Sequence, residues 1–121
     1  MKGKVAIVTG SATGVGAATA VLLAKKGCNV VINYTRSEEE AISTSKLVEE
    51  QNVECIVVKA NVAIDEECKA MVQAAIDKWG RIDYLVNNAG KTKFNPFQNL
   101  EGLSSEDFLD IYSVNVVGPY Q

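Results

Sequence analysis

The sequence predicts an α/β domain in which four parallel strands, in the spatial order 3-2-1-4, form a doubly wound sheet with helices on both faces. Short β-branched runs alternate along the chain with longer segments of helical period, and parallel strands need such crossovers to become neighbours. Glycine- and asparagine-rich turns follow the first and fourth strands. In this order those two turns meet where the sheet reverses direction, which is where such sheets bind ligands.

Four segments are predicted as strands, and each is short, apolar and rich in β-branched residues. They cover residues 5–8, 29–33, 53–58 and 82–86. The 121 residues fit a single domain, with no repeat or linker that would divide it.

Four helices are predicted between and after the strands. The first buries Val15, Ala18, Leu22 and Leu23 at helical spacing and stops at Gly27. The second is capped by Ser37. The third starts at Asp65, buries one face and ends at Gly80, and its buried face is predicted to contain Met71, Val72, Ala75, Ile76 and Trp79. Residues 91–102 are predicted as a loop, and Ser104 or Ser105 caps a last helix that runs through Asn115.

Composition excludes several classes of function. The net charge of −3 gives no electrostatic footprint for nucleic acid or anionic membrane. The apolar runs are too short to span a bilayer, and the start does not resemble a signal peptide, so we expect a cytoplasmic protein. Three widely spaced cysteines and no histidine predict reduced thiols, no metal site and no histidine-based triad.

The turn after the first strand carries three glycines, Gly10, Gly14 and Gly16, directly before a helix. Such glycines let backbone amides approach a diphosphate, and the amino terminus of the helix favours the same negative charge. A plain strand-to-helix turn would need only one glycine. The predicted cofactor-binding residues of this turn are Gly10, Ser11, Thr13, Gly14, Val15 and Gly16.

Thr-Gly-x-x-x-Gly-x-Gly after the first strand, together with Asn-Asn-Ala-Gly at residues 87–90, resembles the paired signature of the short-chain dehydrogenase/reductase family. The resemblance covers the whole chain. It implies a Rossmann-like NAD(P)-binding domain over residues 1–121, incomplete at its carboxyl end. It also implies that Asn88, Ala89 and Gly90 line the ribose of the cofactor.

The choice between NAD(H) and NADP(H) is made after the second strand, at Tyr34, Thr35, Arg36 and Ser37. NAD-dependent members place an acidic residue there, and Tyr34 stands in its place. Arg36 is suited to a 2′-phosphate. The match is to NADP(H)-using members such as 3-oxoacyl-carrier-protein reductases and some glucose dehydrogenases, although Thr13 replaces a second cation that many of them carry. Alternatively, Arg36 is a surface charge paired with Glu39 or Glu40.

Three further residues are assigned by the resemblance. Asn61 and Val62 stand beside the adenine, where the family usually has Asp-Val; alternatively, Asn61 only caps the third helix. Asn115 matches the catalytic helix asparagine, whose distorted backbone holds a water of the proton relay in the family.

The resemblance also implies a serine and a Tyr-x-x-x-Lys pair, and no tyrosine of this chain has lysine four positions later. We therefore expect the 121-residue chain alone to be inactive, as part of a homo-oligomeric NADP(H)-dependent oxidoreductase acting on a small carbonyl or alcohol substrate. Two alternatives remain: a non-catalytic nucleotide-binding module, and a fragment of a related epimerase, which the glycine spacing disfavours.

Overall fold

The sheet of the computed structural model, which describes all 121 residues, has four parallel strands in the order β3-β2-β1-β4, as predicted. Its strands are β1 (Val5–Val8), β2 (Asn29–Tyr34), β3 (Cys55–Lys59) and β4 (Tyr84–Val86). In β1, which lies between β2 and β4, Val8 is in register with both Ile32 and Val86. The carboxyl ends of these three strands therefore lie side by side.

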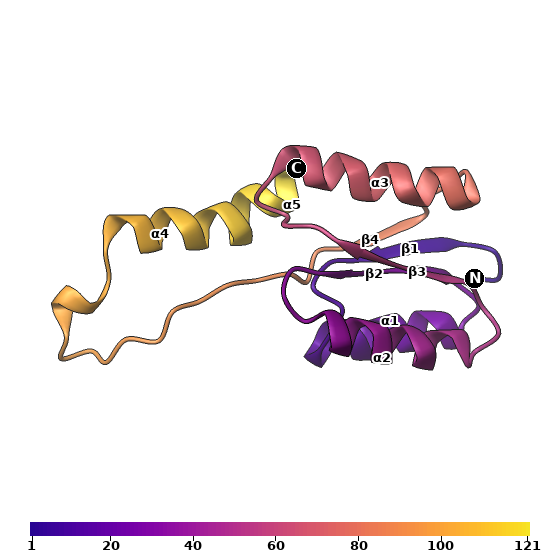
Figure 1. Cartoon of the computed structure of the whole chain (residues 1–121), viewed down its shortest axis with the longest axis horizontal. Coiled ribbons are helices and arrows are strands. Elements are labelled where there is room, and N and C mark those ends of the chain that lie inside the picture. The colour runs from indigo at the N-terminus through magenta and orange to yellow at the C-terminus, as the bar shows by residue number, and fades with distance from the viewer.

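Helices cover both faces of the sheet, again as predicted (Figure 1). Helices α1 (Gly14–Lys25) and α2 (Glu38–Glu49) lie on one face, and α3 (Asp65–Trp79) lies on the other. Strand residues alternate between two apolar clusters because successive side chains point to opposite faces. Val8 and Ile32 belong to the cluster beneath α1 and α2, whereas Ile7 and Val31 pack with the cluster of α3.

The prediction for the buried face of α1 was wrong for three of its four residues, since only Leu23 packs against the core. Val15 is 76% exposed and Leu22 is 57% exposed, and Ala18 is exposed as well. The buried residues are Gly16, Ala20 and Ala24, a row at i, i+4 and i+8. Small residues occupy this row because α1 packs close to the sheet from the point at which it begins, directly after the glycine turn.

Three strands and one helix face also differ in detail from the prediction. Strand β2 extends one residue further than expected, to Tyr34. Strand β3 begins two residues later than expected and continues to Lys59, since Tyr34 still pairs with that residue. Strand β4 covers three residues because the chain reaches register with β1 only at Tyr84. On α3, Met71 and Ala75 are buried as predicted, but Val72 and Ile76 are exposed. Gly80 ends α3 in the left-handed conformation, as expected, with φ +71°.

The segment after β4 extends away from the sheet and returns to it (Figure 1). The predicted loop contains a short 3-10 helix, η1 (Leu100–Gly102). Helix α4 (Ser105–Tyr112) is capped by Ser104, whose hydroxyl and Asp107 form a capping box. A π-helical stretch, η2 (Ser113–Val117), joins α4 to the last turn, α5 (Gly118–Tyr120). Gly118 then packs closely on Val62, where a Cβ would lie 2.7 Å from the Val62 Cγ2 atom.

Candidate functional site

A pocket of about 520 Å³ lies at the carboxyl ends of the strands. The predicted site residues in its wall are Gly10, Thr13, Tyr34, Thr35, Arg36, Ser37, Asn61, Val62, Asn88, Ala89 and Gly90. Segments that follow all four strands thus meet at one site, as the topology predicts for a doubly wound sheet. Ser11, Gly14, Val15, Gly16 and Asn115 are not among its lining residues.

The glycine turn has the geometry that requires glycines. Gly10 and Gly14 have φ values of +62° and +59°, a region in which other residues are strained. Gly16 lies where there is no space for a side chain, because a Cβ there would be 2.4 Å from the Gly10 carbonyl oxygen. The turn and the start of α1 are therefore in direct contact.

The amino terminus of α1 has free hydrogen-bond donors. The backbone N–H groups of Gly14, Val15 and Gly16 form no hydrogen bond within the protein. Thr13 provides no side-chain cap, and the first turn of α1 contains no acidic residue. Unpaired amides and the helix dipole together favour an anion at this position.

Ser11 has a different role from the one predicted. Its side chain is fully buried, where the hydroxyl donates to the Val8 carbonyl at 2.6 Å and accepts the Asn33 N–H at 2.9 Å. Its side chain therefore links the ends of β1 and β2 beneath the glycine turn.

Thr9 and Asn88 join the glycine turn to the segment after β4. The Thr9 hydroxyl accepts the N–H groups of Asn88 and Ala89 at 3.0 and 2.9 Å. In return, Asn88 Nδ2 donates to the carbonyl oxygens of Thr9 and Gly10 at 3.1 and 3.0 Å. The two sequence motifs therefore form one hydrogen-bonded unit.

The segment after β2 places one unpaired cation at the pocket. Arg36 forms no ion pair with Glu39, Glu40 or any other carboxylate, although it shares a shallow depression with the acidic first turn of α2. Tyr34 is half-buried, and burial, followed by the nearby Glu38 carboxylate, raises its pKa.

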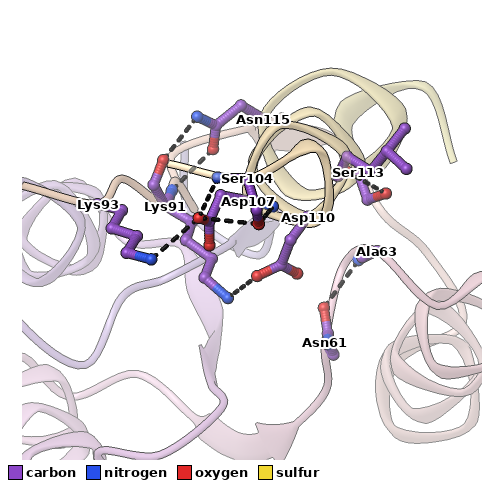
Figure 2. A network of polar contacts seen from close by, with 10 residues as sticks. Asn61, Ala63, Lys91, Lys93, Ser104, Asp107, Asp110, Ser113 and Asn115 are labelled. Carbon is purple, nitrogen blue, oxygen red and sulfur yellow. Dashed lines mark hydrogen bonds and ion pairs between the residues drawn. The ribbon is translucent and has the colours of Figure 1, made fainter. Parts of the chain in front are cut away.

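Asn61 lines the pocket and begins the turn that leads to α3. Its Oδ1 atom accepts the Ala63 N–H at 2.9 Å (Figure 2), and its own N–H donates to Glu67 of α3. The side chain thus organises the turn before α3 but does not cap the helix, whose N-cap residue is Ile64. The Asn61 Nδ2 atom forms no hydrogen bond within the protein.

Asn115 lies in η2 and holds the backbone of Lys91 (Figure 2). Its Oδ1 accepts the Lys91 N–H at 2.7 Å, and its Nδ2 donates to the Lys91 carbonyl at 2.8 Å. Two ion pairs run alongside: Lys91 with Asp110, and Lys93 with Asp107. Asn115 therefore fastens the last helix to the segment after β4.

A model of the family described as short chain dehydrogenase matches residues 4–121. The chain belongs to the short-chain dehydrogenase/reductase family. It is 36% identical over 103 residues to the short-chain dehydrogenase/reductase homolog YusS of Bacillus subtilis, with 85% of this chain and 94% of YusS covered. A short-chain dehydrogenase/reductase structure from Burkholderia xenovorans superposes with a TM-score of 0.92 at 32% identity, over 97% of this chain and 48% of that one.

Another relative of this short-chain dehydrogenase/reductase is the uncharacterized oxidoreductase YhdF of Bacillus subtilis, with 34% identity over 116 residues. The alignment covers 96% of this chain and 39% of YhdF, so the chain spans less than half of that relative's length. No helix of the present chain combines the length and the apolar character needed to cross a membrane.

Sequence reasoning missed four residues of the site. Asn33 is buried, and its side chain accepts the Gly10 N–H at 2.9 Å and donates to the Val58 and Ala60 carbonyls. Thr9 links the glycine turn to the segment after β4, and Lys91 and Asp110 line the pocket. A polar residue at the end of an otherwise apolar strand was the available signal for Asn33 and Thr9. Nothing in the sequence spacing brings Lys91 and Asp110 together.

Proposed function

We propose that this chain binds NADP(H) and forms the cofactor-binding part of an oxidoreductase that transfers a hydride between nicotinamide and a carbonyl or alcohol carbon. The observation that carries the proposal is that the pocket lined by the unpaired Arg36 also contains Thr13, the residue from which α1 and its free amides begin. The nicotinamide supplies or accepts the hydride when it is bound. The residues of the chain bind and orient it.

The pocket and the adjoining start of α1 together fit the parts of such a cofactor. The amides of Gly14, Val15 and Gly16 are suited to the diphosphate. Arg36, after β2, is suited to a 2′-phosphate through two parallel hydrogen bonds. Asn61 retains a free Nδ2 donor for the adenine, and Asn88, Ala89 and Gly90 form the wall beside the other nucleoside. Asn115 positions Lys91 and thereby this wall.

Replacement of Arg36 tests the choice of cofactor. Loss of a hydrogen bond to a charged group costs about 1.5–3 kcal/mol, so Arg36→Ala should weaken NADPH binding by about tenfold or more. NADH binding should be nearly unchanged. Fluorescence titration of both cofactors measures the two affinities.

Lys26→Ala is the matched control, since Lys26 is an exposed cation at the opposite end of α1. It removes the same charge outside the pocket and should leave both affinities unchanged. Equal losses for NADPH and NADH in Arg36→Ala would contradict the assignment of Arg36 to a 2′-phosphate. The acidic first turn of α2 would then favour NAD(H).

A cytoplasmic location, a homo-oligomeric state and a small-molecule substrate are part of the same proposal. They are supported by membership of the family and by a net charge of −3. The match after β2 favours the group of NADP(H)-using members that includes 3-oxoacyl-carrier-protein reductases and some glucose dehydrogenases.

A further inference from the structure

The pocket contains only three charged residues, and they are distributed unequally. Arg36 follows β2, on one side of the central strand β1, whereas Lys91 and Asp110 lie beyond β4, on the other side. Lys91 comes directly after Gly90, and Asp110 projects from α4 (Figure 2). Their side chains form an ion pair in the pocket wall.

The proposed function implies which end of the pocket is reactive. The free amides at the start of α1 are central, so a dinucleotide whose diphosphate lies there extends its two nucleosides in opposite directions. If the adenosine lies toward Arg36 and β3, the nicotinamide lies toward β4. Lys91 and Asp110 therefore flank the position at which a substrate would meet the nicotinamide.

On the basis of the proposed function, we propose that the Lys91–Asp110 pair makes this site specific for neutral polyhydroxylated substrates, such as sugar alcohols and their carbonyl forms. An ammonium group has three donors, and a carboxylate has about four acceptor positions, so the ion pair leaves both groups able to bind hydroxyls. The Lys91 and Asp110 side chains are 42% and 54% exposed, which leaves them accessible to a ligand.

The same pair disfavours the other substrate classes. An apolar alcohol would desolvate both charges without replacing their bonds to water, which is costly. A carboxylate substrate would meet the negative charge of Asp110 beside the lysine. A neutral polyol can accept from the Lys91 Nζ atom and donate to the Asp110 carboxylate at the same time.

A second ion pair on the same two segments provides an internal control. Lys93 Nζ and Asp107 Oδ2 are 2.9 Å apart, and neither residue lines the pocket. Asp107 also caps α4 through Ser104, so the control substitution is made at Lys93. Loss of the Lys93 pair should affect the attachment of α4 without changing the pocket wall.

The experiment measures binding of sorbitol, cyclohexanol and 3-hydroxybutyrate to the chain in the presence of saturating NADPH, by saturation-transfer difference NMR. We expect sorbitol to bind in preference to the other two. Lys91→Met and Asp110→Asn should each weaken sorbitol binding by about tenfold, as expected for loss of hydrogen bonds to a charged group. Lys93→Met should match the wild-type chain.

Each outcome has a distinct meaning. Preferential binding of cyclohexanol or 3-hydroxybutyrate, or equal effects of Lys91→Met and Lys93→Met, would overturn the assignment. Absence of any alcohol binding to the NADPH complex would also overturn it, while leaving the cofactor proposal intact. Failure to bind NADPH or NADH would instead overturn the proposed function itself. Should Lys91→Met lose its circular dichroism spectrum, the nearly isosteric Asp110→Asn decides the question.

Discussion

Thr9 connects the end of β1 to the segment after β4 through one hydroxyl group. That oxygen accepts two backbone N–H groups, those of Asn88 and Ala89. Thr9→Val keeps the shape of the side chain but leaves both donors unsatisfied, so we expect the free energy of unfolding to fall by about 1–3 kcal/mol. Urea denaturation followed by circular dichroism measures the change.

Thr19→Val is the control for this substitution, since the Thr19 hydroxyl only donates to the Val15 carbonyl on the exposed side of α1. Its effect should stay within about 0.5 kcal/mol, as for most surface substitutions. Similar losses for the two variants would show that the Thr9 hydroxyl has no special role.

Asp83 makes stability depend on pH. Its carboxylate accepts hydrogen bonds from Arg81 and from the Val5 N–H, and these lower its pKa to about 2. Since the unfolded value is about 3.9, the stabilisation is complete above that pH and disappears as the pH falls toward 2. The difference in Tm between wild type and Asp83→Asn should therefore shrink over this interval in thermal melts.

Asp77→Asn removes an exposed carboxylate from α3 and serves as the comparison. Its Tm should follow that of the wild type across the same pH range. A constant gap between Asp83→Asn and wild type from pH 5 to about pH 2 would contradict the role of the ionised carboxylate.

At the scale of single residues, prediction from the sequence was most specific at positions where a motif required a particular backbone conformation. Gly10 and Gly14 were predicted from spacing, and their positive φ values explain that spacing. Ser11 was misassigned because the sequence does not distinguish a serine whose hydroxyl faces the ligand from one whose hydroxyl faces the core. Lys91 and Asp110 were missed because tertiary packing alone makes them neighbours.

At the scale of the elements, helix α1 shows how close packing is encoded. The row of Gly16, Ala20 and Ala24 faces the sheet, and Gly16 touches the glycine turn. Gly16→Ala places a methyl group 2.4 Å from the Gly10 carbonyl oxygen, so the turn or the helix must move. We expect cofactor affinity to fall by about tenfold or more and stability to fall by about 1–3 kcal/mol, the usual cost of overpacking.

Ala18→Leu is the matched control, because it enlarges a side chain on the exposed side of the same helix. It should change neither quantity, as measured by fluorescence titration and urea denaturation. Wild-type affinity in Gly16→Ala would mean that the contact between turn and helix can relax without disturbing the pocket.

The order of the elements was predictable because alternating strand and helix periods leave few right-handed arrangements of a parallel sheet. The buried face of α1 was not predictable from apolar spacing alone. Hydrophobic periodicity identifies large buried side chains, but here the approach of the helix to the sheet selects small ones. The ends of β3 and β4 likewise depend on pairing with β2 and β1. This pairing cannot be predicted from the sequence of one segment alone.

At the scale of the whole molecule, two apolar surfaces of this chain lack a covering layer. Strand β4 is an edge of the sheet, with Leu85 55% exposed. Helix α4 extends away from the sheet (Figure 1) and exposes Phe108, Leu109 and Tyr112. An uncovered edge strand has free backbone donors and acceptors that another chain can pair with, and exposed apolar patches promote association.

We therefore predict that the 121-residue chain self-associates through the β4 edge. Leu85→Lys introduces a charge there, a common means by which edge strands avoid pairing, and should shift sedimentation velocity profiles toward the monomer. Leu22→Lys is the control, because Leu22 is equally accessible on the opposite layer, at 57% exposure, and has no free strand edge beside it. Equal shifts for both variants would indicate general hydrophobic association. A wild-type chain that sediments as a monomer and melts in one sharp cooperative transition would contradict the role of the edge, because pairing at β4 would then be unnecessary for a stable fold.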